Sequence, residues 1–326
     1  MEQSLPVGPA DIDLAARVIA PFAVRTPLLS FPVLNERVGA SVFLKLEMLQ
    51  RTGSFKFRGA FNKVSSIPET KRGGGVVAFS SGNHAQGVAA AARILNLQAT
   101  IVMPSDAPLS KRERTKAYGA EVVLYDRDHE DREAIAQAIA EKRGATLVKP
   151  YDDPVVIAGQ GTVGREIAED MAVLGIAPDI VVAPASGGGL IAGVATAVKA
   201  RYPLAQLIVA EPEAFDDYGR SLVAGRREPH APAGRTICDA LMAPMPGEIT
   251  FAINRKLLSR GITASDEEVG AAVAFAFHEL KLVVEPGGAV GLAALLAGRL
   301  DAAGKNIVIV LSGGNVDADM FAELVA

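Results

Sequence analysis

Cysteine is nearly missing from this 326-residue sequence, which contains only Cys238, and tryptophan is missing altogether. A single cysteine cannot form an intrachain disulfide, so we expect the protein in a reducing compartment, the cytoplasm. The four histidines are scattered without the spacing of metal ligands, which argues against a zinc site. No nucleophile-elbow motif surrounds a serine, which argues against a hydrolase of that class.

The sequence also has no excess of basic residues. It contains 33 lysines and arginines against 37 acidic residues, and its net charge is −4. We therefore expect no nucleic-acid-binding surface. The N-terminus reads MEQSLP, acidic and interrupted by proline, unlike a targeting signal. One uncharged stretch, residues 180–198, is long enough to cross a membrane, but Pro184 and four glycines favour a buried strand, loop and helix. We expect no membrane association.

Short strand-like and helix-like segments alternate along the chain, for example at residues 100–103, 111–118 and 121–124. This alternation predicts an α/β fold with parallel sheets covered by helices. A hydrophobic content of 49% with 32 glycines fits buried strands, and the chain is long enough for two packed lobes.

Three glycine-rich turns each follow an apolar strand-like run. They lie at residues 80–84, 186–190 and 312–315, and helix-like segments follow the first two. In a strand, glycine turn and helix, backbone N–H groups and the positive end of the helix converge on one point. The sequence therefore predicts sites for an anionic group at these turns.

Lys56 lies between Phe55 and Phe57, with glycine and small residues on both sides. Crowding by the aromatic rings would desolvate the ammonium and lower its pKa, and the neutral amine could then bond to an aldehyde. The alternative is a solvated lysine on an amphipathic helix, which a single motif does not exclude.

Taken together, Lys56 and the three turns resemble the fold-type II enzymes that use pyridoxal phosphate (PLP), and within them the serine/threonine dehydratase and serine racemase group. The resemblance runs from about residue 26 to the C-terminus. It implies the tryptophan synthase β-like fold, with a large domain at 1–74 and 150–326 and a small domain at 75–149. It further implies a homodimer, with the cofactor in a cleft that the small lobe closes over substrate.

The resemblance also assigns roles to individual residues. It implies that Lys56 carries the cofactor and that Phe55 packs on the cofactor ring, with Asn83 at the ring hydroxyl and Ser312 at the ring nitrogen. The backbone of the second turn would cradle the phosphate, through Ser186, Gly187, Gly188, Gly189 and Leu190. Glu285 would lie near the ring, although the start of a helix is an equally good interpretation of its position. The first turn would bind the substrate carboxylate, through Ser80, Ser81, Gly82, Asn83 and His84.

The predicted activity is the elimination of water from a β-hydroxy α-amino acid such as threonine, serine or 3-hydroxyaspartate, giving a 2-oxo acid and ammonia. Because the Ser312 hydroxyl is neutral, it would not hold the ring nitrogen protonated, and this favours elimination over transamination. Lys56 is placed to act as the base for the Cα proton. Ser81 aligns with the serine that acts on the opposite face in racemases, so a serine or aspartate racemase is the alternative.

Two features bear on which amino acid is bound. Residues 238–242 read CDALM, where relatives that act on serine or threonine often have Ala-Asp-Gly, so the bulk of Ala240 and Met242 argues against a plain threonine dehydratase. Arg132 matches an arginine that approaches a second carboxylate in the racemase-like group, which favours 3-hydroxyaspartate. The alternative for Arg132 is a solvated helix residue paired with Glu130 or Asp131.

An acidic turn after the strand-like residues 207–210 resembles the divalent-cation site of the same group. The resemblance gives Glu211, the Phe215 carbonyl and Asp217 as ligands. Oxygen ligands of this kind suit Mg²⁺ or Ca²⁺, with Mn²⁺ as a further candidate. An ordinary acidic surface turn is the alternative.

A remote alternative function comes from residues 159–164, GQGTVG, which fit the dinucleotide fingerprint of NAD-dependent dehydrogenases. Asp152, Asp153 and Pro154 instead indicate the start of a helix before this motif. Asp179 also begins a strand, whereas the ribose-binding acid should end one.

Overall fold

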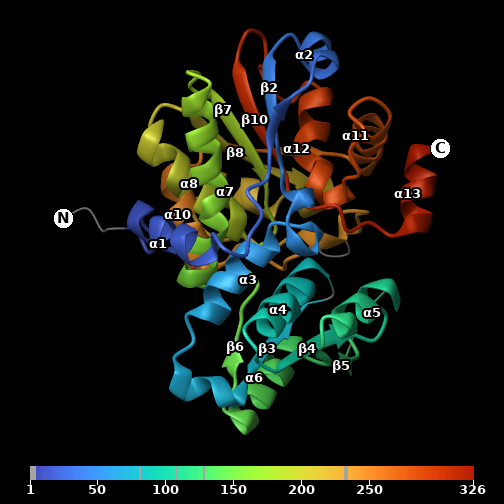
Figure 1. Cartoon of the computed structure of the whole chain (residues 1–326). Helices are drawn as coiled ribbons and strands as arrows, with labels where there is room; N and C mark the ends of the chain where they lie inside the picture. The colour runs from blue at the N-terminus through green and yellow to red at the C-terminus, as the bar shows by residue number, and fades with distance from the viewer. Residues whose placement is uncertain (1–4, 81, 108, 128, 231–233) are drawn as a thin grey trace.

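The computed structural model describes residues 5–80, 82–107, 109–127, 129–230 and 234–326. Within these ranges the strands form two sheets, one of six strands and one of four. Figure 1 shows the larger sheet and its helices in the upper part of the molecule, the smaller sheet in the lower part, and α3 (Lys56–Ser65) between them. Over the same ranges, no helix combines the length and apolar character needed to cross a membrane.

The larger sheet has the strand order β1-β2-β10-β7-β8-β9, in which β1 is antiparallel to β2 and the other neighbours are parallel. Its strands are β1 (Leu28–Ser30), β2 (Ser41–Leu46), β7 (Ile180–Pro184), β8 (Gln206–Pro212), β9 (Arg260–Ala264) and β10 (Asn306–Leu311).

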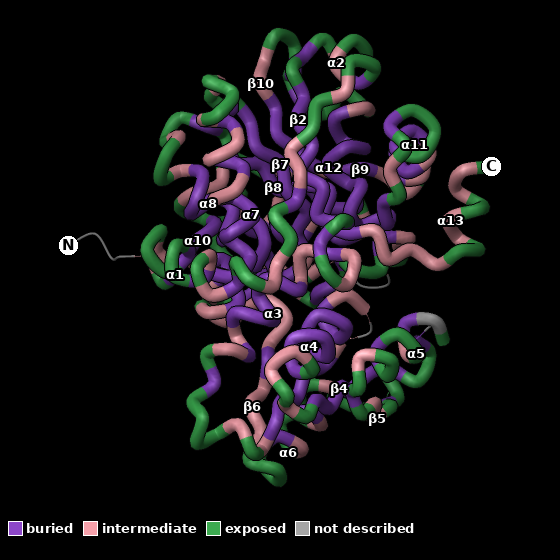
Figure 2. Tube along the Cα trace, viewed as in Figure 1, coloured by how far each residue is buried: buried purple, intermediate pink, exposed green. Residues whose placement is uncertain are grey.

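Both faces of the larger sheet are buried by helices, so its central strands are continuous apolar runs (Figure 2). Ile180 and Val182 of β7 pack into one core with α11 (Asp266–His278) and α12 (Pro286–Leu296). Val181 points the other way, into a core with α7 (Pro154–Val173) and α8 (Gly189–Arg201). The predicted α/β architecture is confirmed.

The smaller sheet has the order β5-β4-β3-β6 and is parallel throughout. One face packs on α3 and α4 (Asn83–Ile94), and the other on α6 (Arg132–Arg143). Its strands are β3 (Val76–Phe79), β4 (Ala99–Pro104), β5 (Glu121–Tyr125) and β6 (Thr146–Leu147). All four lie within residues 75–149, which supports our proposal that this segment is a small domain inserted into a large one formed by residues 1–74 and 150–326.

Two of the helices that flank these layers begin where the local sequence favours a helix start. Asp131 caps α6 by accepting hydrogen bonds from Glu133 N and Ala134 N, and Asp153 caps α7 in the same way, with Pro154 in the first turn. The other helices are α1 (Pro9–Ile19), α2 (Pro32–Val38), α5 (Leu109–Ala117), α9 (Asp217–Ala224), α10 (Glu248–Leu257) and α13 (Ala318–Val325).

The glycines of residues 159–164 lie inside α7, so the dinucleotide interpretation is wrong. These glycines allow helices to approach closely. A Cβ on Gly159 would overlap the backbone of α3 at Gly59, and a Cβ on Gly164 would overlap the backbone of α8 at Val194. The glycine pattern that mimics a phosphate-binding turn therefore serves helix packing.

A buried ion network fixes α3 against the larger sheet. The guanidinium of Arg58, two residues after Lys56, is fully buried and bonds both carboxylate oxygens of Glu47 and both of Glu166 at 2.7–2.9 Å. The buried ammonium of Lys45 donates to Glu166 at 2.7 Å, so two cations face two carboxylates. Removing one member would leave an uncompensated buried charge, which makes this network a strong constraint on the position of α3.

Candidate active site

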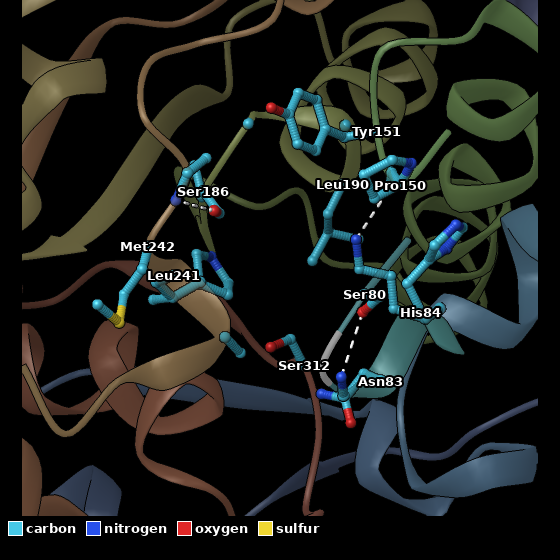
Figure 3. Close-up of a pocket in the computed structure, with 18 of the residues that line it drawn as sticks. Ser80, Asn83, His84, Pro150, Tyr151, Ser186, Leu190, Leu241, Met242 and Ser312 are labelled. Atoms are coloured by element: carbon cyan, nitrogen blue, oxygen red, sulfur yellow. Dashed lines mark hydrogen bonds between the residues drawn. The ribbon is translucent and has the colours of Figure 1, made fainter. Parts of the chain in front are cut away.

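A pocket lies between the two sheets, where the turns after β3, β7 and β10 meet. Figure 3 shows Ser80, Asn83 and His84 on one side of it, Tyr151 and Ser186 on another, and Ser312 between them. In open α/β folds the carboxyl ends of parallel strands are the usual place for a ligand. The three glycine turns predicted from the sequence thus converge on one site.

Lys56 is the first residue of α3 and extends into this pocket. Its Nζ donates a hydrogen bond to the Pro150 carbonyl at 2.8 Å and lies 5.3 Å from the centre of the Phe55 ring. Burial lowers the pKa of Lys56 to about 8, against an opposing effect of Glu285. Only Phe55 contributes to this environment as expected, because Phe57 is fully buried in the core against Phe61.

The segment before Lys56 is held by the third glycine turn. Phe55 N donates to the Ser312 carbonyl at 3.1 Å, and Gly314 N donates to the Gly53 carbonyl at 2.9 Å. These bonds fix Lys56 relative to Ser312, which is 4% exposed and lines the same pocket.

Asn83 is held in one orientation by two partners. Its Nδ2 donates to Glu285 Oε1 at 2.6 Å, and its Oδ1 accepts from Asn315 Nδ2 at 2.8 Å. Glu285 stands before α12 without capping it through its side chain, so its carboxylate is available to Asn83. Burial, and then the charge of Asp239, raise the pKa of Glu285 to about 7.

The second glycine turn, residues 186–190, is shaped by its neighbours. Gly188 has φ of 89°, in the left-handed region that favours glycine, and α8 begins at the next residue without a side-chain cap. A Cβ on Gly187 would overlap the Tyr151 ring, and a Cβ on Gly188 would overlap Tyr218.

The carbonyl groups of this turn are engaged by α10. Thr250 Oγ1 donates to the Gly187 carbonyl at 2.6 Å, and Asn254 Nδ2 donates to the Gly188 carbonyl at 3.2 Å. Neither Thr250 nor Asn254 lines the pocket. With its carbonyls directed toward α10, the turn and the N-terminus of α8 present positive potential to an anion.

The first turn carries the other predicted substrate-binding residues. Ser80 and Gly82 line the pocket, and Gly82 N donates to Ser80 Oγ at 3.2 Å; Ser81 lies outside the described residues. His84 Nε2 is 2.9 Å from the Val148 carbonyl, and its buried Nδ1 has no hydrogen-bond partner. Burial, reinforced by Lys56, lowers the pKa of His84 to about 3, so the ring is neutral.

Arg132 begins α6 and lines the pocket, with its guanidinium carbon 5.6 Å from the centre of the Phe79 ring. No ion pair joins it to a carboxylate in the part of the chain that the structure describes. The ion pair with Glu130 or Asp131 that the alternative interpretation expects is not formed among the described residues. Glu130 instead accepts from Asp126 N, and Asp131 caps α6.

Comparison with known proteins agrees with this geometry. A family model described as "Pyridoxal-phosphate dependent enzyme" matches residues 19–313. The chain belongs to the pyridoxal-phosphate-dependent enzyme family. It is 46% identical to an L-threo-3-hydroxyaspartate ammonia-lyase of a Pseudomonas species, over 96% of this chain and 97% of that protein.

Two further relatives widen the comparison. An L-threonine ammonia-lyase of Thermotoga maritima is 43% identical, over 97% of this chain and 77% of that protein. The structure of maize serine racemase matches with a TM-score of 0.92 at 37% identity, over 98% of this chain and 96% of that one.

The residues present fit PLP on structural grounds. The tightly packed turn at residues 186–190 suits the phosphate, since side chains there would collide with Tyr151 and Tyr218. Lys56 supplies an amine of lowered pKa that would hold the cofactor covalently. Phe55, Asn83, Glu285 and Ser312 line the space between them, and their individual roles toward the ring stay predictions.

The predicted metal ligands, Glu211, Phe215 and Asp217, are buried beneath the glycine turn at residues 186–190 and do not lie on the surface. Glu211 is buried at the end of β8, and its two oxygens accept from Tyr218 N and Gly219 N at 2.8 Å each. Asp217 Oδ2 is buried without a partner. Burial raises the pKa of Asp217 to about 6, and burial with the Asp217 charge raises the pKa of Glu211 well above its ordinary value.

Within the described ranges, no group of three or more His, Cys, Asp or Glu side chains could hold a metal. A site at Glu211 and Asp217 would therefore need backbone oxygens such as the Phe215 carbonyl.

Sequence reasoning missed four residues that shape the pocket. Tyr151 packs beneath the glycine turn, Asn315 orients Asn83, and Lys111 forms an ion pair with Asp239 across the pocket. Asn315 and Asp239 belong to segments that the sequence had singled out, whereas Tyr151 and Lys111 carry no local signal.

Proposed function

We propose that this protein is a PLP-dependent ammonia-lyase that eliminates water from a β-hydroxy α-amino acid and releases ammonia and a 2-oxo acid. Among the candidates we favour 3-hydroxyaspartate as substrate. The observation that carries this choice is Arg132, which lines the pocket without an ion-pair partner among the described residues. The similarity to L-threo-3-hydroxyaspartate ammonia-lyase supports it.

PLP, when bound, withdraws electrons from Cα of an amino acid attached to it. In our proposal Lys56 Nζ takes the Cα proton, and its pKa of about 8 keeps a useful fraction of the amine neutral near physiological pH. Ser312 offers a neutral hydroxyl toward the pocket. The turn at residues 80–84 would bind the α-carboxylate, and Ser81, on the opposite face, would donate the proton with which the β-hydroxyl leaves as water.

Arg132 would bind the second carboxylate of 3-hydroxyaspartate. A planar guanidinium can form two parallel hydrogen bonds with a carboxylate, which threonine and serine lack. Ala240 and Met242 also line the pocket and reduce the space on the substrate side.

The test is to assay ammonia and 2-oxo acid release from L-threo-3-hydroxyaspartate, L-threonine and L-serine by wild type and by Arg132→Ala. We expect Arg132→Ala to lower kcat/KM for hydroxyaspartate about a hundredfold and to change that for threonine less than about threefold. Lys142→Ala, at an exposed position of the same helix, is the matched control. Equal losses on both substrates would remove the dicarboxylate assignment.

Serine or aspartate racemisation is the second candidate, because the chain resembles maize serine racemase over nearly its whole length. Chiral analysis of L-serine recovered from the reaction measures it. Accumulation of D-serine faster than ammonia would replace the lyase assignment.

We also propose a divalent cation, Mg²⁺ or Ca²⁺ or Mn²⁺, bound by Glu211, Asp217 and the Phe215 carbonyl. Two buried carboxylates, one with an unpartnered oxygen, support it. Its role would be structural, because Tyr218, whose N–H bonds Glu211, reaches the phosphate turn through Asn254. A cytoplasmic homodimer completes the proposal, and light scattering of the purified protein tests the oligomeric state.

A further inference from the structure

One ion pair spans the pocket and has no role in the function proposed above. Lys111 lies on α5, beside the smaller sheet, and its Nζ contacts Asp239 Oδ2 in the 3₁₀ turn at Asp239–Leu241 of the large domain. Both residues line the pocket. The Lys111 side chain is 11% exposed, whereas that of Asp239 is 53% exposed, so the carboxylate lies at the solvent-accessible part of the pocket lining.

The helix that carries Lys111 is held in place by a second contact. One turn further along α5, Arg114 Nη1 donates to Asn315 Oδ1 at 3.3 Å, and Asn315 in turn orients Asn83. The ammonium of Lys111 is therefore presented to Asp239 by an anchored helix.

The charge of Asp239 acts inside the pocket. After burial, Asp239 is the main cause of the raised pKa of Glu285, and Lys111 acts in the opposite direction. A substrate with two carboxylates would meet the same field. Without Lys111, the Asp239 carboxylate would repel its second negative charge.

We propose that Lys111 is a specificity-determining residue, whose ammonium neutralises Asp239 so that the pocket admits a substrate with a second carboxylate. This inference rests on the proposed function and deepens it. Arg132 would attract the distal carboxylate, whereas Lys111 removes a repulsion that would cancel the attraction.

Four variants of the holoenzyme test this role: Lys111→Met, Asp239→Asn, the double variant, and Lys116→Met as the control. Lys116 lies on the same helix, is 54% exposed and pairs with Glu113, so its replacement makes the same charge change away from the pocket. The readouts are KM for L-threo-3-hydroxyaspartate and L-threonine, and the inhibition constants of succinate and butyrate, which carry two charges and one.

We expect Lys111→Met to raise KM for hydroxyaspartate and the inhibition constant of succinate about tenfold, with changes below about threefold for threonine and butyrate. The double variant should restore both values to within about threefold of wild type. Asp239→Asn alone should leave them unchanged or lower, and Lys116→Met should change neither.

If the Lys111–Asp239 ion pair only held the two sheets together, the variants would show a different pattern. Breaking the pair from either side would then impair all four ligands alike, and the double variant would not recover. Either result overturns the proposal. If Lys111→Met fails to fold, Asp239→Asn still decides, because a raised KM for hydroxyaspartate in that variant contradicts charge neutralisation.

The two proposals fail separately. If wild type releases no ammonia from any β-hydroxy amino acid, the lyase assignment is lost, but binding of succinate relative to butyrate to wild type and Lys111→Met still measures the charge effect. If wild type is active and the succinate-to-butyrate ratio is the same in Lys111→Met, the role of Lys111 alone is lost.

Discussion

At the scale of single residues, this site depends on charges held away from water. Burial lowers the pKa of Lys56 to about 8, while Glu285 opposes that change. Glu285 is itself raised to a pKa of about 7 by burial. The pKa values of Lys56 and Glu285, which ordinarily lie far apart, are thus both brought close to 7. A group with a pKa near the ambient pH can both give and accept a proton at physiological pH.

Replacing Lys56 with alanine should abolish covalent attachment of the cofactor and lower turnover at least about a thousandfold, because the amine is both the attachment point and the proposed base. Wild type should be yellow, and borohydride reduction should fix the chromophore to the peptide that contains Lys56. Absorbance and peptide mass measure this. Lys71→Ala, at an exposed position, is the control, and a colourless wild type would contradict the prediction.

Replacing Glu285 with glutamine should change the pH dependence of stability in the apoprotein. The folded protein holds the Glu285 proton up to pH about 7, whereas the unfolded chain releases it near the ordinary value of 4.5. The stabilisation from this group is therefore complete below pH 4.5 and is lost as pH rises through 7, by up to about 3 kcal/mol.

Urea unfolding at several pH values measures this loss as a fall in the free energy of unfolding of wild type relative to that of Glu285→Gln as pH rises from 4.5 through 7. Exposed Glu279→Gln is the control. A difference that stays constant from pH 4.5 to 8 would show that burial of Glu285 has no such effect.

At the scale of elements, packing fixes the glycine turn before α8, where we propose that the phosphate of the cofactor binds. Tyr151 and Tyr218 fill the space beside Gly187 and Gly188, and α10 bonds the carbonyl groups of both glycines. The turn therefore has little freedom to move when a phosphate binds.

A methyl group at position 187 should weaken cofactor binding, because Gly187→Ala would force either the Tyr151 ring or the turn to shift. We expect a loss of affinity of about tenfold, from overpacking of one to a few kcal/mol. Absorbance titration of the apoprotein with PLP measures it. Gly73→Ala is the control, since a Cβ there meets open space, and unchanged affinity in Gly187→Ala would mean that the turn is more pliable than its packing indicates.

At the scale of the whole molecule, the pocket lies between the two sheets, and the residues around it come from distant parts of the chain. The proposed cation belongs to this scale, because its proposed ligand Glu211 on β8 accepts from Tyr218 N of α9, and Tyr218 Oη accepts from Asn254 of α10, which also bonds the Gly188 carbonyl. Its loss should affect global stability more than any single contact.

Removing divalent cations with a chelator should lower the Tm of wild type by roughly 5 °C, since a ligand that binds only the folded state stabilises it in proportion to its binding free energy. Asp217→Asn should show little further change with chelator, whereas Glu213→Gln, at an exposed acid of the same turn, should respond as wild type does. Differential scanning calorimetry with and without Mg²⁺ or Ca²⁺ measures this. Identical Tm values for wild type in both conditions would exclude the cation.

Local sequence was sufficient wherever the chemistry is local. The strand and glycine turn units around residues 80–84, 186–190 and 312–315 were predicted from residue order, as were the helices after the first two turns, because neighbouring residues determine a turn and a helix start. Lys56 could be singled out for the same reason, as could the helix start at Asp153, which caps α7. The α/β class followed from the alternation of these units.

Tertiary structure decided whatever depends on residues far apart in the chain. Asn83 meets Asn315 and Glu285, and Lys111 meets Asp239, only because parallel strands bring the ends of distant segments to one edge. Tertiary structure also decided that Phe57 faces the core. The glycines of α7 have the spacing of a phosphate-binding turn, and only the packing of α7 against α3 and α8 shows that they serve helix contacts. Residue order specifies the groups that can react, and packing specifies which of them meet, because contacts across more than a hundred residues are set by the sheets rather than by any local pattern.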